Sequence, residues 1–212
     1  NDTKWQIINK KMKIKNLVDK TTSFLFKRLS ELAGLVLLCA SLLLLISLIS
    51  YSPEDPNFIF PENAEIKNLL GAKGSYVSDI LYQSLGLISL LVPISFFFIS
   101  LLVIIDKKIL HFVESLFFTI LYSITGTLFF TVYHTETYWL TINGNNGFIG
   151  NLFEETLLIN LVNINNQISY IILIVIILFF FLLSVNFKFR YFKFFLKIFT
   201  KSKKISSKSA VE

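Results

Sequence analysis

The chain has 212 residues, of which 54% are hydrophobic and 16% aromatic, and its 20 Lys and Arg against 14 Asp and Glu give a formal net charge of +6. The apolar residues are gathered into uninterrupted blocks, which argues against a water-soluble domain. Cys39 is the only cysteine, so an internal disulfide is excluded.

Four blocks without a charged residue follow one another along the chain, at 32–49, 80–105, 115–133 and 168–187. A helix rises about 1.5 Å per residue, so roughly 20 residues cross a hydrocarbon layer about 30 Å thick. The first and fourth blocks are apolar around their whole circumference, unlike core helices, which keep polar positions at helical spacing. We therefore expect an all-α integral membrane fold with four transmembrane helices, at about 31–51, 78–105, 111–133 and 166–187.

Lys and Arg are distributed unevenly between the two sides of this membrane domain. Eight precede the first span, Lys107 and Lys108 lie between the second and third, and eight follow the fourth, whereas only Lys67 and Lys73 fall in the remaining connections. Because basic residues accumulate on the cytoplasmic side, we expect both termini to be cytoplasmic. The chain then divides into a basic cytoplasmic segment at 1–28, the membrane domain at 29–187, and a basic juxtamembrane segment that begins a linker at 188–212.

Two local features are predicted within the spans. Pro93 lacks an N–H group and its ring clashes with the preceding turn, so we expect a bend in the middle of the second span. Glu114 and His111 begin the third span close to the interface, where their polar ends reach the headgroups, and a role in proton transfer is the less favoured interpretation.

The connection from His134 to Gln167 contains "NGNNGFIGNLFEETLLINLV". Its apolar residues recur at helical spacing, which predicts a short helix. Such a helix would lie on the outer surface or be tucked between the spans, and the sequence leaves both placements open.

Sequence motifs of catalysis are absent. There is no G-x-x-x-x-G-K-[ST] loop, no HExxH and no CxxC, and "GAKGSY", which begins at Gly71, lacks the spacing of a phosphate-binding loop. We expect no catalytic, cofactor-binding or metal-binding residues in this chain, which we do not interpret as an enzyme.

The stretch "SYSPEDPNF" directly follows the first apolar block. Tyr51 stands at the depth where aromatic rings settle among lipid headgroups. Pro53 and Pro56 prevent the helix from continuing, and Asp55 can accept hydrogen bonds from nearby backbone, so the stretch predicts a rigid helix stop.

This stretch resembles the S-[YF]-x-P-x-D-P-[SN]-aromatic sequence in the amino-terminal four-span region of FtsK/SpoIIIE-type DNA translocases. "NLLGAKGSYVSDILYQSLGLISLLVPI" is similar to the run that precedes a mid-span proline in that family, and "GNNGFIGNLF" to its glycine-rich element, with Asn146 where a second glycine is common. The resemblance extends from about Phe24 to Val185. The positions of the first two stretches that we expect to form a recognition surface or a structural turn are Tyr51, Pro53, Asp55, Pro56, Phe58, Asn68, Gly71, Gly74 and Asp79.

The resemblance implies a membrane anchor at the division septum of the bacterial inner membrane. It implies that a cytoplasmic ATPase motor, absent from this chain, binds ATP and Mg²⁺, contacts DNA and assembles as a hexamer. The anchor itself would contact the lipid bilayer and other division proteins. We also expect that the natural start is Met12 or that Asn1 belongs to a longer protein.

Two other functions stay open at this stage. A small transporter or channel subunit would need polar groups facing a lumen, for which the spans offer Gln83, some Ser and Thr, and Glu114. A stand-alone multi-span scaffold without a motor is the other alternative.

Overall fold

The computed structural model describes residues 2–56, 65–134, 140, 142–154, 156, 159 and 166–186. Regular structure within these residues is helical throughout, as expected, and four helices are long and apolar enough to cross a membrane. Their ranges are Met12–Ile49, Gly71–Asp106, Leu110–Tyr133 and Gln167–Ser184.

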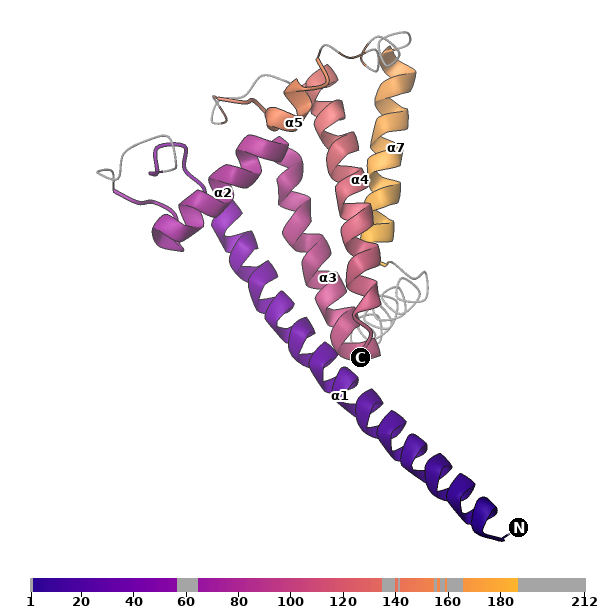
Figure 1. Cartoon of the computed structure of the whole chain (residues 1–212). Helices are drawn as coiled ribbons and strands as arrows, with labels where there is room; N and C mark the ends of the chain where they lie inside the picture. The colour runs from indigo at the N-terminus through magenta and orange to yellow at the C-terminus, as the bar shows by residue number, and fades with distance from the viewer. Residues whose placement is uncertain are drawn as a thin grey trace, which may run out of the picture.

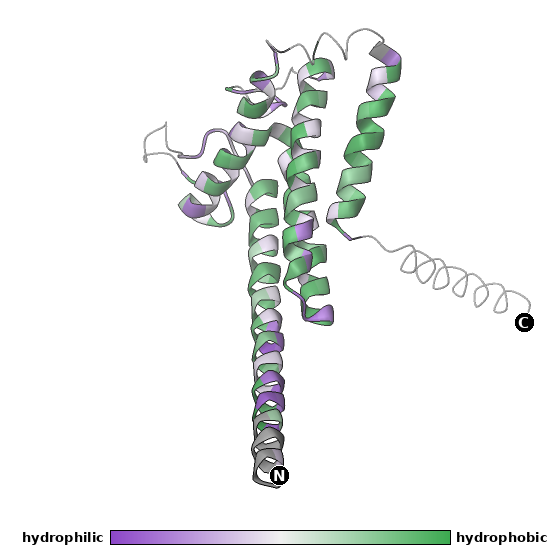
Figure 2. Ribbon diagram, turned by 45° about the vertical axis from the view of Figure 1, so that its right-hand side comes forward, coloured by the Kyte–Doolittle hydropathy of each residue, from purple (hydrophilic) through white to green (hydrophobic). Residues whose placement is uncertain are grey.

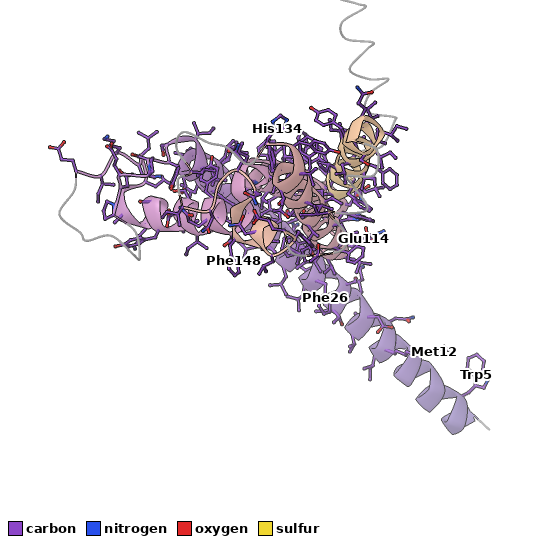
Figure 3. The ribbon with its side chains drawn as sticks, turned by 90° about the horizontal axis from the view of Figure 1, so that it is seen from above. Trp5, Met12, Phe26, Glu114, His134 and Phe148 are labelled. Carbon is purple, nitrogen blue, oxygen red and sulfur yellow. The ribbon has the colours of Figure 1, made fainter. Side chains whose placement is uncertain are left out.

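The first helix, α1, runs without interruption from Asp2 to Ile49. It therefore includes the basic segment that the sequence analysis separated from the first span, and it projects well beyond the other helices (Figure 1). Trp5 and Met12 point away from it into open space, with 69% and 56% of their surface exposed (Figure 3).

The second apolar segment is divided into three elements. α2 covers Gly71–Leu85, the 3-10 helix η1 covers Gly86–Leu90, and α3 covers Leu91–Asp106. Figure 1 shows α2 lying crosswise above α3. The chain thus turns at η1 and not at Pro93, which lies in the first turn of α3, where proline is tolerated. The bend expected at Pro93 was wrong in its position, because a glycine seven residues earlier makes the turn.

The remaining helices are α4, Leu110–Tyr133, α5, Gly147–Asn151, and α7, Asn166–Ser184. α3 and α4 form the expected antiparallel hairpin, and Lys107 ends α3 in the left-handed conformation, with φ 56°. A bridge through Glu31 ties this turn to α1, since its carboxylate lies 2.6 Å from both Arg28 and Lys107. We call this the turn end of the molecule.

The helices pack in two pairs that are joined through α3 and α4. α1 packs mainly on α3, and α4 packs mainly on α7. Gly34 lets α1 approach α3 closely, because a Cβ there would lie 2.7 Å from Ile104 Cγ1. Between α4 and α7, Thr119 and Ser184 share a buried hydrogen bond of 2.7 Å. Small residues and hydroxyl groups thus make the interhelical contacts, as is usual in membranes.

The outer sides of α7 and of the second half of α1 are apolar and uncovered, and Figure 2 shows the apolar residues of both. Polar residues are concentrated in the middle of α1, at the turn end, and at the opposite end (Figure 2). That opposite end carries residues 50–56, 65–90, 140, 142–154 and 156, and we call it the loop end. The described chain begins on the turn-end side, and α7 finishes there (Figure 1).

Candidate functional site

The turn that follows α1 is held by the carboxylate of Asp55, which is 1% exposed. Its two oxygens accept hydrogen bonds from the backbone N–H groups of Lys67 and Asn68, each at 2.8 Å. The carbonyl of Pro56 accepts a third from Ser75 Oγ of α2, at 2.9 Å. Because a buried carboxylate needs hydrogen bonds to replace water, these contacts make the turn a clamp between the end of α1 and the start of α2.

Asn68 is the second buried member of this clamp. Its side-chain amide donates to the Ser47 carbonyl of α1 at 2.9 Å and to Ser78 Oγ at 3.4 Å, and its Oδ1 accepts the Leu70 N–H at 3.0 Å. A Cβ on Gly74 would overlap Asn68 Oδ1. The Asn68 side chain therefore fits at this place only because residue 74 is a glycine.

A second polar chain begins at Tyr51 and crosses α2. The Tyr51 hydroxyl donates to Asp79 Oδ1 at 3.1 Å, and Gln83 Nε2 donates to the same oxygen at 3.3 Å. Asn143 Nδ2 in turn donates to Gln83 Oε1 at 3.0 Å. Burial, and next the negative charge of Asp79, raise the pKa of Tyr51 well above its ordinary value, so the phenol stays protonated as a donor.

The bend at Gly86 is built against the glycine-rich loop before α5. Gly86 has φ +66°, and a Cβ there would overlap the carbonyl oxygen of Asn145. That oxygen accepts the Leu87 N–H at 2.9 Å. Gly147 has φ +65°, and its own Cβ would lie 2.5 Å from the Gly86 nitrogen. Two glycines far apart in the sequence thus allow two backbones to touch.

The asparagines of this loop attach it to α4. Asn145 Nδ2 donates to the His134 carbonyl at 2.9 Å. Asn146, which is 2% exposed, donates to Thr131 Oγ1 at 3.3 Å and to Asn151 Oδ1 at 2.6 Å. The contacts described in this and the preceding paragraphs together form what we call the loop-end network. Its members are Tyr51, Asp55, Asn68, Asp79, Gln83, Asn143, Asn145 and Asn146.

A comparison with known proteins covers most of the chain. Residues 26–199 match the family described as the 4TM region of DNA translocase FtsK/SpoIIIE, which is most of the chain. The chain belongs to this family. It is thus a multi-pass membrane protein of the FtsK family, and the matched portion is the membrane region of these translocases.

Curated relatives of the FtsK family are similar over a shorter stretch. The chain is 40% identical over 68 residues to a DNA translocase FtsK of Azospirillum brasilense, covering 31% of this chain and 11% of the relative. It is 37% identical over 68 residues to a DNA translocase FtsK of Rickettsia bellii, covering 32% and 9%. The match thus spans about a tenth of the length of these relatives. No solved structure matches the chain at a significant level.

Eight of the nine residues proposed from the FtsK resemblance lie at the loop end, within or beside the network. Gly71 begins α2 with φ +66°, its N–H donates to the Asn68 carbonyl at 2.9 Å, and a Cβ there would meet no atom within 4 Å. Pro53 is exposed, whereas Asp55 and Pro56 are buried. Phe58 lies outside the described residues. The described residues of this set therefore lie close together at the loop end, and most of their side chains face the interior of the protein.

The sequence does not single out several residues that the loop end uses, within the network and beside it. Ser47 lies in an apolar span and beside the network, yet its hydroxyl donates to the Gly74 carbonyl at 2.7 Å. Asn143 and Asn145 were not singled out, and Asn146 was noted only as a departure from the family pattern. The available signal was a run of asparagines between glycines, since buried amides in such a loop satisfy backbone groups that a helix would otherwise satisfy.

The buried polar groups of the loop end hold the helices together, and their hydrogen-bonding atoms are engaged within the protein. Asp55 is engaged by two backbone donors and Asp79 by Tyr51 and Gln83. Within the described residues, no three His, Cys, Asp or Glu side chains come together in a group that could hold a metal ion. The exposed parts of the turn are Pro53 and the ion pair of Glu54 with Lys67. This pairing lowers the pKa of Glu54 and raises that of Lys67.

Proposed function

We propose that this chain is the membrane-anchoring region of a septal DNA translocase, which couples chromosome segregation to cell division. The observation that carries the proposal is the match of residues 26–199 to the four-span region of FtsK/SpoIIIE proteins. In this proposal the anchor supplies location and assembly, and a cytoplasmic ATPase motor supplies the chemistry. That motor would bind ATP and Mg²⁺, contact DNA and form the hexamer.

The orientation follows from the basic residues. The turn end carries Arg28, Lys107 and Lys108, and the positive-inside rule places it in the cytoplasm. Both termini would then be cytoplasmic in a bacterial inner membrane, and the loop end would face outward. There it could contact other division proteins through its exposed rim, formed by Pro53, Glu54 and Lys67.

The buried position of Asp55 supports a structural role for its side chain in this surface. A carboxylate that accepts two backbone N–H groups from inside the fold cannot also reach a partner. We assign partner contact to the exposed rim and positioning of that rim to Asp55 and Asn68.

The transporter alternative receives less support. Gln83 is engaged by Asp79 and Asn143 at the loop end, and Glu114 lies at the turn end with 54% of its side chain exposed. Gln83 and Glu114, two of the polar residues named for a lumen, are thus at opposite ends of the helices, and Gln83 is used by the fold. A scaffold without a motor remains the second candidate.

Localisation of the full protein tests the proposal. A fluorescent fusion is expected to form a band at the septum of dividing cells. Replacing the four-span region by an unrelated four-span anchor should disperse the band while leaving the motor intact. Septal recruitment that survives this replacement would remove the anchoring role.

A further inference from the structure

The helix α2 turns its polar side toward the protein and leaves an apolar side uncovered. Its buried residues are small or hydrogen-bonding: Gly74, Ser75, Ser78, Asp79 and Tyr82. Val77 and Ile80, by contrast, are 45% and 47% exposed, and Leu69 just before the helix is 77% exposed. Helical spacing places 70, 73, 77 and 80 on one face. A helix of this kind, lying crosswise to the spans, is typical of the membrane interface.

Below this face, α2 and α1 enclose a notch of about 410 Å³. Its wall comes from α1 and its roof from α2, and the lining residues that matter here are Ala40, Leu43, Leu44, Leu70, Lys73 and Val77. The corner is closed by Ser47, whose hydroxyl donates to the Gly74 carbonyl at 2.7 Å. The surface that lines the notch is almost wholly apolar, and Lys73 of α2, which borders the notch, is exposed.

The height of the notch fits within one leaflet of a bilayer. The α1 residues that line it run from Ala40 to Ser47, seven residues or about 10 Å along the helix, against about 15 Å for half of the hydrocarbon layer. The wall thus stands among acyl chains and the roof lies at headgroup level. This placement rests on the membrane spans alone, whichever leaflet is involved.

The roof restricts what can fill the notch. A transmembrane helix of a second copy or of another protein, lying along α1, would meet α2, which crosses above the end of α1 (Figure 1). An acyl chain ends at the headgroup and needs no room beyond it. A phosphate at that level would find Lys73, which is exposed at the notch.

We propose that the notch is a phospholipid-binding site, in which one acyl chain lies between α1 and α2 and Lys73 binds the phosphate of an anionic headgroup. The van der Waals contact on two sides holds the chain more firmly than the flat side of one helix could. The bound lipid would support the underside of α2 and therefore the loop-end network above it. The proposal does not depend on septal tethering, which is tested separately by localisation.

Native mass spectrometry of the full protein, released from nanodiscs that contain equal amounts of phosphatidylglycerol and phosphatidylcholine, tests this site. The protein is expected to retain phosphatidylglycerol preferentially. Ala40→Phe fills the notch and should reduce retention of both lipids. Lys73→Gln should lower the ratio of phosphatidylglycerol to phosphatidylcholine about fivefold, which corresponds to about 1 kcal/mol for one lysine at a bilayer surface.

Matched controls separate the notch from the rest of the surface. Leu42→Phe adds an aromatic ring to an exposed position of α1 that does not line the notch, and Lys108→Gln removes a charge at the turn end. Both should retain lipid as the unaltered protein does. Circular dichroism and elution volume report folding, and Val77→Phe fills the notch from the roof if Ala40→Phe misfolds.

Two outcomes would overturn the proposal. One is unchanged lipid retention in well-folded Ala40→Phe or Val77→Phe together with Lys73→Gln. The other is dissociation of an oligomer by the notch variants with no change in bound lipid, because the notch would then be filled by a second copy of the chain.

Discussion

At the scale of single residues, Asp55 and Glu54 are neighbouring acids in the sequence that differ in burial and therefore in their contribution to stability. Asp55 is 1% exposed and holds two backbone N–H groups, whereas the Glu54 side chain is 73% exposed and pairs with Lys67 at the surface. Surface ion pairs contribute little to stability, while a buried acceptor with two donors contributes substantially. The stability of the turn therefore depends mainly on Asp55.

Asp55→Asn tests this difference directly. The amide keeps the size of the side chain but replaces one acceptor oxygen by an NH₂ group, which would face a backbone donor. We expect a loss of about 1–3 kcal/mol in the free energy of unfolding, the cost of a buried hydrogen-bonding group left unsatisfied.

Thermal or chemical unfolding in one detergent measures this loss, with Glu54→Gln as the control at the exposed neighbour. Glu54→Gln is expected to change stability by less than about 0.5 kcal/mol. Equal effects of the two substitutions would show that the Asp55 clamp is not a main support of the loop end.

At the scale of elements, the crosswise position of α2 is set where η1 meets the loop before α5. Gly71 and Gly86 share φ +66°, but only Gly86 has another backbone against the place of its missing side chain. These two glycines therefore separate the cost of a left-handed backbone from the cost of a close contact.

Gly71→Ala is expected to cost about 1–2 kcal/mol, the strain of a side chain in the left-handed region. Gly86→Ala should cost distinctly more, because its Cβ would overlap the Asn145 carbonyl and displace the loop from Leu87. Unfolding measurements on both variants give the comparison, and limited proteolysis of the 142–154 loop reports its displacement. Similar losses for the two alanines would mean that the loop moves away without cost.

At the scale of the whole molecule, the predicted orientation is the property on which the proposed function depends most. The basic turn end and the loop end lie at opposite ends of the helices, so one experiment can assign both (Figure 1). Cys39 is exposed on α1 and has to be removed first.

In a Cys39→Ala background, a single cysteine at position 54 should react with a membrane-impermeant thiol reagent in intact cells. A single cysteine at position 108 should react only after the membrane is permeabilised, because the positive-inside rule places the turn end in the cytoplasm. Both native residues are exposed, so neither position is shielded by the fold. The reverse labelling pattern would invert the topology and remove the proposed cytoplasmic motor.

The sequence by itself determined the helical class, the four apolar spans, the α3–α4 hairpin and the membership that the family match confirms. The helical class and the spans depend on local composition, because an uninterrupted apolar block in lipid forms a helix in which each backbone group is satisfied within its own segment. The family membership depends on short sequence motifs. The motifs also indicate that Tyr51, Asp55, Asn68 and Asp79 form one functional or structural element. They do not indicate which of these residues are buried.

Only the tertiary structure decided where the second segment bends and what the turn after α1 does. The bend at Gly86 depends on the Asn145 carbonyl, and the burial of Asp55 depends on the N–H groups of Lys67 and Asn68. The notch under α2 depends on how α2 crosses α1, and the two helices are separate segments of the sequence. Each is a contact between segments separated along the chain, and local patterns of hydrophobicity carry no information about which distant backbone will supply the partner.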